Sequence, residues 1–180
     1  MSGKPLVVLD PGHGGRSPGA VSRSGLREKE INMAICLAVY QALEGLAEVL
    51  LTRQGDENVT LVQRAALANA ARADCFVSVH CNSSVDRRAR GTETFCFPGS
   101  AAGRRLAVLL QQQLVRSLYL PDRGVKTARF AVLRQTRMPA ALVEVAFLSN
   151  TVEEELLRDQ AVRQKAGRAL ARGIGEFLGL

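Results

Sequence analysis

The sequence has 180 residues, of which 47% are hydrophobic and 23% are charged, an ordinary balance for one globular domain. No apolar run approaches the roughly 20 residues that a membrane-spanning helix needs, so we expect no membrane insertion. The net charge of +7 favours anionic partners, but only 4% of the residues are aromatic and Trp is absent, so we expect no nucleic-acid partner.

Short apolar segments alternate with amphipathic ones, which predicts an α/β layered domain without repeats or linkers. The expected strands are Leu6–Asp10, Ala47–Thr52, Asp74–His80, Gly91–Phe97, Ala131–Arg134 and Ala141–Phe147. The first three expected helices are Glu28–Leu46, Leu61–Arg72 and Ala101–Leu118. A capping box of Thr151 and Glu154 predicts the start of a fourth, short helix. The last helix is expected from Asp159, with an inward face formed by Val162, Ala166, Leu170, Ile174 and Phe177.

The four cysteines contain no Cys-x-x-Cys pair, so a cysteine-based zinc site is not expected. Cys36 falls in a helical pattern, and Cys75 and Cys96 fall in strand patterns. We expect these three to be buried free thiols. Cys81 follows His80 and should point to the opposite side of its strand.

The two histidines of the chain both lie where a site of an open α/β sheet would form, at the carboxyl ends of expected strands. His13 stands in the glycine-rich segment Asp10–Gly15, whose glycines allow the loop to close on an ion. His80 ends its strand. A catalytic zinc ion typically takes three ligands from His and carboxylate side chains, so these two residues need one acidic partner.

Glu28 opens the first long helix and is the favoured third ligand. Glu30 is its nearest competitor, but two residues' spacing places the two side chains on different faces of the helix. Ile31 and Ile35 mark the core side, three and seven residues after Glu28. The spacing therefore turns Glu28 towards the sheet and Glu30 towards solvent or the helix cap.

Glu144 interrupts an otherwise apolar strand. An ionised carboxylate is costly to bury unless it is paired or lies near a metal ion, so this residue is a candidate acid/base group. The alternative is an internal ion pair with Arg134 or Arg64. The other candidates have simpler readings as well: His13 as part of a tight turn, His80 as a core histidine, and Glu28 as a carboxylate favoured at a helix N-terminus.

These residues stand in segments that resemble the zinc-dependent N-acetylmuramoyl-L-alanine amidases of bacterial autolysins and phage endolysins. The resemblance runs in the family's order through most of the chain: residues 8–15, 27–32, 51–53, 61–64, 68–69, 78–82, 91–94, 122–125 and 142–150. It implies that His13, Glu28 and His80 hold one Zn²⁺ per chain and that Glu144 is catalytic.

The resemblance also implies a fold, an α/β single domain with a mixed, mostly parallel sheet of about six strands flanked by helices (phosphorylase/hydrolase-like). The implied reaction is peptidoglycan hydrolysis at the amide between N-acetylmuramic acid and L-alanine of the stem peptide, by zinc-activated water with Glu144 moving the proton. A zinc peptidase or deacylase of the same fold, acting on another bond, is the alternative. A non-catalytic binding module would lack a ligand, and none is missing.

Further expectations concern the surroundings of the site. Asn82, Arg64 and Arg134 are candidate substrate-binding residues, and the protein is expected to be a monomer. Residues 1–180 are expected to form one catalytic amidase domain without a separate wall-binding domain. It would be made in the cytoplasm without a signal peptide and act on the cell wall after release, in the periplasm or outside the cell, or be an excised domain of a secreted enzyme.

The sequence departs from the family pattern at a few positions. Ser17 stands where the family often has Asp, and Ala146 stands where Gly is common. Cys81 stands where a small apolar residue is usual, and its thiol beside His80 suggests that the site is sensitive to oxidation. Only ten residues separate His80 from Gly91, too few for the helix that covers the site in regulated amidases. We therefore expect an open cleft.

Overall fold

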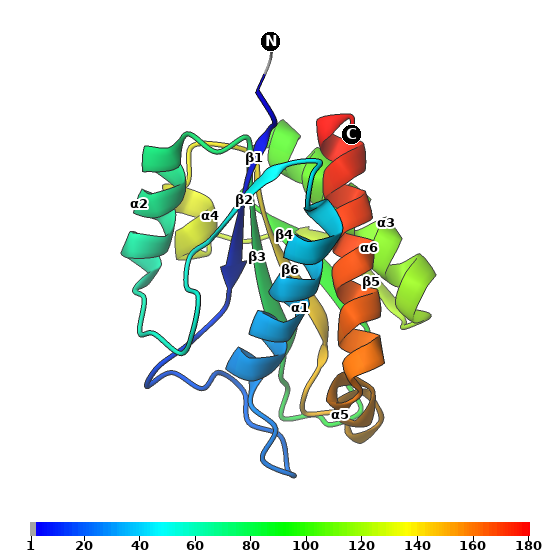
Figure 1. Cartoon of the computed structure of the whole chain (residues 1–180). Helices are drawn as coiled ribbons and strands as arrows, with labels where there is room; N and C mark the ends of the chain where they lie inside the picture. Colours follow the sequence, from blue (N-terminus) through cyan, green and yellow to red (C-terminus); the bar gives the residue numbers. More distant parts are fainter. Residues whose placement is uncertain (1–2) are drawn as a thin grey trace.

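One mixed sheet, in the order β2-β1-β3-β6-β4-β5, forms the centre of the computed structural model, which describes residues 3–180 (Figure 1). Its strands are β1 (Leu6–Pro11), β2 (Glu48–Leu51), β3 (Cys75–Asn82), β4 (Thr92–Cys96), β5 (Asp122–Thr127) and β6 (Ala140–Phe147). All neighbouring pairs are parallel except β4 and β6, which are antiparallel. The expected mixed, mostly parallel sheet is confirmed.

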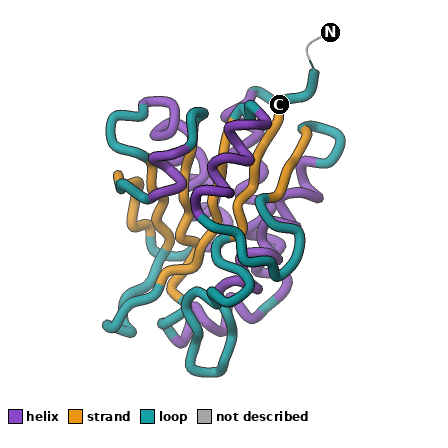
Figure 2. The backbone as a smooth tube through the Cα atoms, turned by 90° about the vertical axis from the view of Figure 1, so that its left-hand side faces the viewer, coloured by secondary structure: helices purple, strands orange, loops and turns teal. Residues whose placement is uncertain are grey.

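Helices cover both faces of this sheet, as the tube view in Figure 2 shows. The helices α1 (Glu28–Leu43), α3 (Ala101–Leu118) and α6 (Gln160–Leu178) pack together on one face, and α2 (Leu61–Ala71) and the short α4 (Ala131–Gln135) lie on the other. The helix α5 (Thr151–Arg158) connects β6 to α6. Among the described residues, we found no helix with the length and apolar character needed to cross a membrane.

The central strands are apolar over most of their length because helices cover both of their faces. Val7 and Leu9 of β1 lie in the larger core cluster with α1, α3 and α6, whereas Val8 lies in the smaller cluster with α2 and α4. The same alternation places Phe76 of β3 and Leu142 of β6 in the smaller cluster.

The carboxyl ends of β1, β3 and β6 meet at one edge of the sheet, at the bottom of Figure 1. Because β4 runs antiparallel to β6, its first residues lie at this edge too. His80 pairs in register with Glu144, and Glu144 pairs with Glu93. Registered partners point to the same face, so these three side chains form a row across β3, β6 and β4.

One expected strand was wrong, and one strand of the structure was missed. Ala131–Arg134, expected to be a strand, lies within helix α4, whose Val132 and Leu133 are buried. The sixth strand is instead β5, a polar edge segment whose residues are all exposed or half-buried. An edge strand with little burial carries no apolar alternation, and a five-residue helix is too short to show a helical period.

Helix boundaries differ from the expectation in smaller ways. The first helix ends at Leu43 rather than Leu46. The expected capping box of Thr151 and Glu154 is wrong, because Asn150 caps α5 through its side-chain oxygen, which accepts from the backbone N–H groups of Val152 and Glu153. The last helix does begin after Asp159, which caps it, and its residues Ala166, Leu170 and Ile174 are buried as expected.

Candidate metal centre

The side chains of His13, Glu28 and His80 converge at the carboxyl edge of the sheet. His13 lies in the loop after β1, Glu28 is the first residue of α1, and His80 is near the end of β3. One ligand atom from each lies within 4.8 Å of the other two. Glu28 stands between the histidines, with Oε2 3.2 Å from His13 Nε2 and Oε1 3.0 Å from His80 Nδ1.

Backbone and side-chain donors hold the Glu28 carboxylate in this position. Its Oε2 accepts from the N–H of Ala20 at 2.7 Å, and its Oε1 accepts from the N–H of Cys81 at 3.1 Å and from Asn32 Nδ2 at 3.3 Å. Burial alone would raise the pKa of Glu28, but the contacts with the two histidines and with Ala20 outweigh it and hold the pKa well below its usual range. The carboxylate is therefore kept in the charged form that a metal ligand requires.

Two glycines leave the space that these side chains occupy. A Cβ atom on Gly12 would lie 2.3 Å from His80 Cε1, and one on Gly19 would lie 2.4 Å from Glu28 Oε2 and 2.6 Å from His13 Cδ2. Gly19 also has a φ of +71°, which side-chain-bearing residues rarely adopt. The glycines in this part of the chain thus allow the backbone to approach the three side chains closely.

The donor set fits a zinc ion. Two imidazole nitrogens and one carboxylate are the ligands of many catalytic zinc sites, which keep a fourth position open. Zinc bonds of 2.0–2.2 Å at tetrahedral angles need ligand atoms about 3.3 Å apart. Each oxygen of the Glu28 carboxylate lies close to that distance from one histidine, Oε2 at 3.2 Å from His13 and Oε1 at 3.0 Å from His80. In addition, Ser17 Oγ lies 3.0 Å from His13 Nδ1, the ring nitrogen that faces away from Glu28.

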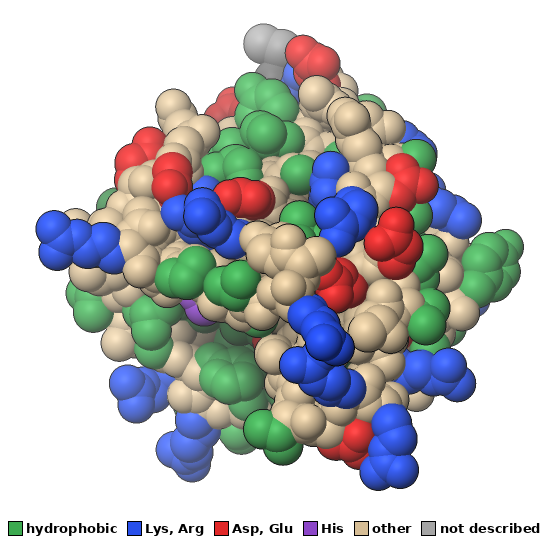
Figure 3. Space-filling model, turned by 90° about the horizontal axis from the view of Figure 1, so that it is seen from below, with side chains coloured by type: hydrophobic (Ala, Val, Ile, Leu, Met, Phe, Trp, Pro, Cys, Tyr) green, Lys and Arg blue, Asp and Glu red, His purple; other side chains and the backbone are tan. Residues whose placement is uncertain are grey.

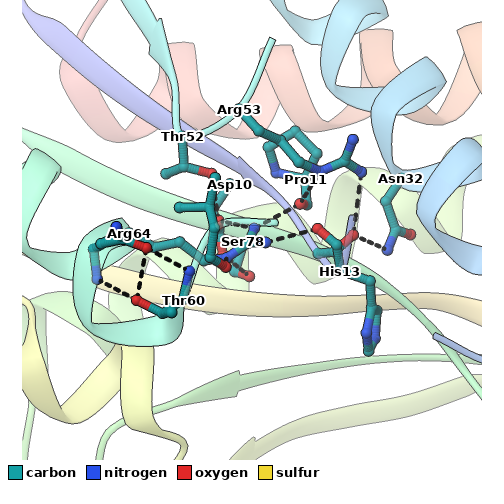
Figure 4. Close-up of polar contacts among 12 residues, drawn as sticks. Asp10, Pro11, His13, Asn32, Thr52, Arg53, Thr60, Arg64 and Ser78 are labelled. Atoms are coloured by element: carbon teal, nitrogen blue, oxygen red, sulfur yellow. Dashed lines mark hydrogen bonds and ion pairs between the residues drawn. The ribbon is translucent and has the colours of Figure 1, made fainter. Parts of the chain in front are cut away.

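Buried cations hold the loop that carries His13 (Figure 4). Arg53 donates to the carbonyl groups of Pro11 and Gly12, and Arg64 donates to those of Pro11 and His13, the last at 2.6 Å. Lys29 donates to the carbonyl of Gly15 at 3.0 Å. His13 itself has a φ of +63°, a left-handed conformation that these contacts support.

Asp10 anchors the same region from beneath. Its carboxylate, 1% exposed, accepts from Thr52 Oγ1, Arg64 Nη1 and Ser78 Oγ at 2.5–2.7 Å. These bonds connect β1 with the end of β2, with α2 and with β3. Asp10 was assigned no role from the sequence, although its place at the start of the glycine-rich segment Asp10–Gly15 was an available signal.

Glu144 lies beside the three converging side chains, next to His80 in the sheet. Its Oε2 atom is buried and has no hydrogen-bond partner among the described residues. Burial raises the pKa of Glu144 well above its usual range, and the charges of Glu28 and Glu93 raise it further. The alternative, an ion pair of Glu144 with Arg64 or Arg134, is absent among the described contacts, and Arg64 bonds to Asp10 instead.

Glu93, which sequence reasoning left without a role, completes the row at β4. Its Oε1 accepts from Asn82 Nδ2 at 2.7 Å, and its Oε2 accepts from Arg123 Nε at 2.9 Å and from Lys126 Nζ at 2.5 Å. Burial raises its pKa, but the two cations outweigh this effect, so the pKa of Glu93 is lowered.

The residues expected to bind substrate lie in three different settings. Asn82 is half-buried at the end of β3 and bonded to Glu93. Arg64 is 3% exposed, and its donors bond to Asp10 and to three carbonyl groups, which makes it a positioning residue for the His13 loop. Arg134 is exposed on α4 and has no described side-chain contact with the converging residues. Glu30 is exposed and pairs with Arg27, as expected for a residue facing solvent.

All four cysteines are buried free thiols. For Cys81, burial raises the pKa well above its usual range, and the charges of Glu28, Glu144 and Glu153 raise it further. Because the thiolate is the reactive form, this environment argues against the suggested oxidation sensitivity of Cys81.

A cleft of about 290 Å³ opens beside His13 and His80, bordered on its far side by Asn58, Thr60 and Leu61 at the start of α2. Figure 3 shows a small area of histidine surface at the edge of a recess, next to hydrophobic and neutral groups and with Lys and Arg side chains around it. The segment between β3 and β4 contains no helix, as expected from its length.

Comparison with known proteins gives a consistent result. A family model described as N-acetylmuramoyl-L-alanine amidase matches residues 7–176. YqiI of Bacillus subtilis (strain 168) is 42% identical over 95% of this chain and 84% of its own length. The N-acetylmuramoyl-L-alanine amidase AmiC of Neisseria meningitidis serogroup B is 33% identical over 97% of this chain, which spans 53% of AmiC.

A solved structure extends the similarity to the fold. The catalytic domain of CwlV, an N-acetylmuramoyl-L-alanine amidase from Bacillus (Paenibacillus) polymyxa var. colistinus, superposes with a TM-score of 0.93 at 38% identity, covering 97% of this chain and 98% of that domain. The match therefore extends over nearly the whole fold. This chain belongs to the N-acetylmuramoyl-L-alanine amidase family.

Proposed function

We propose that this chain is a zinc-dependent peptidoglycan hydrolase that cleaves the amide bond between N-acetylmuramic acid and L-alanine of the stem peptide. His13, Glu28 and His80 would hold the metal ion, and Glu144 would be the acid/base residue. The observation that carries the proposal is the convergence of three ligand atoms within 4.8 Å of one another, beside a buried Glu144 oxygen that has no partner among the described residues.

Each side chain has a defined part in this reaction. A zinc ion held by His13, Glu28 and His80 would supply Lewis-acid activation of the scissile carbonyl and of a water molecule. Glu144 accepts the proton of the attacking water at its carboxylate and donates it to the departing nitrogen of L-alanine. The carbon–nitrogen bond breaks, leaving a carboxylate on the muramic acid and a free amino group on the peptide. Glu28 stays anionic because its contacts with the histidines and Ala20 favour the charged form.

The proposed substrate is peptidoglycan, and the site of action is the cell wall. The segment between β3 and β4 leaves the cleft uncovered by a helix, so we propose that activity needs no activator protein. We also propose that the active form is a monomer, with one zinc ion per chain. Size-exclusion chromatography of the active fraction, with metal analysis of the same fraction, tests both statements.

Product analysis on defined muropeptides tests the reaction itself. Protein stripped with a chelator and reloaded with zinc should release the stem peptide with a free L-alanine amino group, and the stripped protein should be inactive. Cleavage at a peptide bond beyond L-alanine, read by mass spectrometry, would support the peptidase alternative instead. Full activity in the presence of the chelator would exclude the zinc mechanism.

A further inference from the structure

Two cations stand at the end of the row formed by His80, Glu144 and Glu93. Arg123 is the second residue of the exposed edge strand β5, and Lys126 follows three residues later. Both pair with Glu93, yet their side chains remain 36% and 42% exposed, whereas that of Glu93 is 7% exposed. The row therefore leads from the candidate metal centre to a positively charged, accessible surface.

The charges in this group do not cancel. Glu93 forms ion pairs with both cations, so Glu93, Arg123 and Lys126 together carry one net positive charge. Arg123 uses Nε for Glu93 and Nη1 for a long contact of 3.4 Å with the carbonyl of Arg90, and its Nη2 has no described partner. Lys126 has one described acceptor, Glu93. Donors of both cations are therefore available to an anion from outside.

Aromatic rings keep both cationic groups in place. The guanidinium of Arg123 lies 4.8 Å from the centre of the Phe147 ring, and the ammonium of Lys126 lies 5.9 Å from the centre of the Phe95 ring. Together with their bonds to Glu93, these contacts orient both groups before an anion arrives.

The distance from the metal centre suits a short peptide. Neighbouring strands lie about 4.8 Å apart, so the step from His80 on β3 to Glu93 on β4 is roughly 10 Å. An extended peptide covers about 3.3–3.6 Å per residue, so a chain that starts at the scissile amide reaches Glu93 with its second or third residue. The opposite side of the centre presents the neutral residues Asn58, Thr60 and Leu61, which suit an uncharged sugar better than a carboxylate.

We propose that Arg123 and Lys126 form a subsite that binds a stem-peptide carboxylate and orients the peptide across β6 and β4. In bacterial stem peptides, the residue after L-alanine is D-glutamate linked through its γ-carboxyl group, and its α-carboxylate is either free or amidated. A third residue of the diaminopimelate type supplies another carboxylate of the same chemistry. The inference rests on the proposed function, and it predicts that amidation of the recognised carboxylate weakens the substrate.

Matched substrates test this without any variant. We would measure kcat/KM for muramyl-L-Ala-D-Glu and muramyl-L-Ala-D-isoGln, and for muramyl tripeptides whose diaminopimelate carboxylate is free or amidated. The zinc-loaded wild-type protein should favour the free acid by about five- to tenfold in at least one pair. The pair that shows the preference identifies the carboxylate that is bound.

Single variants then locate the preference. Arg123→Gln and Lys126→Gln should each lower the acid-to-amide ratio towards one, mainly through KM, while activity on the amidated substrate changes little. Each variant leaves Glu93 one cation, which protects the fold. Arg123→Lys should restore part of the ratio because it keeps the charge. Arg168→Gln, on α6 at the opposite face of the sheet, is the matched control and should keep the wild-type ratio.

The outcomes separate this inference from the proposed function. If both members of each pair are cleaved at the muramoyl–alanine bond with equal kcat/KM, the amidase activity stands and the subsite is refuted. The subsite is also refuted if the preference survives unchanged in Arg123→Gln and Lys126→Gln. If no muramoyl–alanine bond is cleaved in any substrate, the proposed function itself fails.

Discussion

The guanidinium of Arg64 lies 2.7 Å from the carboxylate of Asp10, and both side chains are almost fully buried. Arg64 also donates to the carbonyl of His13, so this ion pair connects α2 and β1 to the loop that carries a proposed metal ligand. The contact therefore has two functions, one in stability and one in the placement of His13.

Replacing Arg64 with Met should destabilise the fold and displace His13. The change leaves Asp10 as a buried charge without its cation, which typically costs about 3–5 kcal/mol. We would measure the free energy of unfolding in urea, together with zinc affinity. Arg134→Met removes an exposed cation from α4 and should change stability by less than about 0.5 kcal/mol. Equal stability of the two variants would contradict this role for Arg64.

Glu144→Gln should abolish most activity while preserving the fold. The amide has nearly the shape of the carboxylate but cannot take a proton from water, and loss of an acid/base group typically costs about 10²–10⁴-fold in rate. The measurement is kcat on a muropeptide, with zinc content and melting temperature as checks. Glu155→Gln, at an exposed position of α5, serves as the control. A zinc-loaded Glu144→Gln protein with wild-type kcat would remove Glu144 from the mechanism.

The same variant should change how the stability of the metal-free protein depends on pH. Burial and the charges of Glu28 and Glu93 raise the pKa of Glu144 above its ordinary value of 4.5. Between 4.5 and the raised pKa, the folded state therefore binds a proton that the unfolded chain has released. The stabilising contribution of Glu144 is complete below pH 4.5 and is lost as the pH rises through the raised pKa.

Melting temperatures measured with a chelator present would test this direction. Relative to wild type, Glu144→Gln should gain stability as the pH rises above 4.5, because the variant has no carboxylate to ionise in the buried site. A difference between the two proteins that stays constant with pH would show that Glu144 titrates in the folded state as it does in the unfolded chain.

Gly12→Ala should weaken metal binding more than it weakens the fold. The added methyl group would lie 2.3 Å from the His80 ring, so the ring or the loop must move. We expect zinc affinity to fall by at least about tenfold, measured by competition with a chromogenic chelator. Gly175→Ala is the matched control, because its methyl group would meet its nearest neighbour at 3.9 Å. Unchanged zinc affinity in Gly12→Ala would show that the ring tolerates the crowding.

The candidate ligands were within reach of sequence reasoning because their types are rare in this chain. Only two histidines exist, and both lie at the carboxyl ends of expected strands, at the same edge of an α/β sheet. The spacing to Ile31 and Ile35 favoured Glu28 over Glu30, and the structure places Glu28 between the two histidines and Glu30 in solvent. The buried partners of this group were harder to foresee, because Asp10 and Glu93 bond to residues from distant segments.

The missed strand β5 shows why the other side of the site escaped prediction. Its half-buried and exposed residues do not alternate, so its sequence lacks the usual pattern of a strand. Its pairing with β4 depends on the position of that strand rather than on its own residues. When β5 is not predicted, the sequence gives no reason to distinguish Arg123 and Lys126 from the other surface cations of this basic chain. Only the sheet order places them beside Glu93 and in line with Glu144.

Lys29, Arg53 and Arg64, from three different segments, bond to backbone carbonyl groups of the loop between β1 and α1. The protein's own contacts thus hold the path of this loop. The proposed metal ion would then be exchanged at a preorganised site without the cost of folding the loop around it. Metal substitution, for example by cobalt as a spectroscopic reporter, should accordingly proceed under native conditions and leave amide hydrogen exchange in this loop slow.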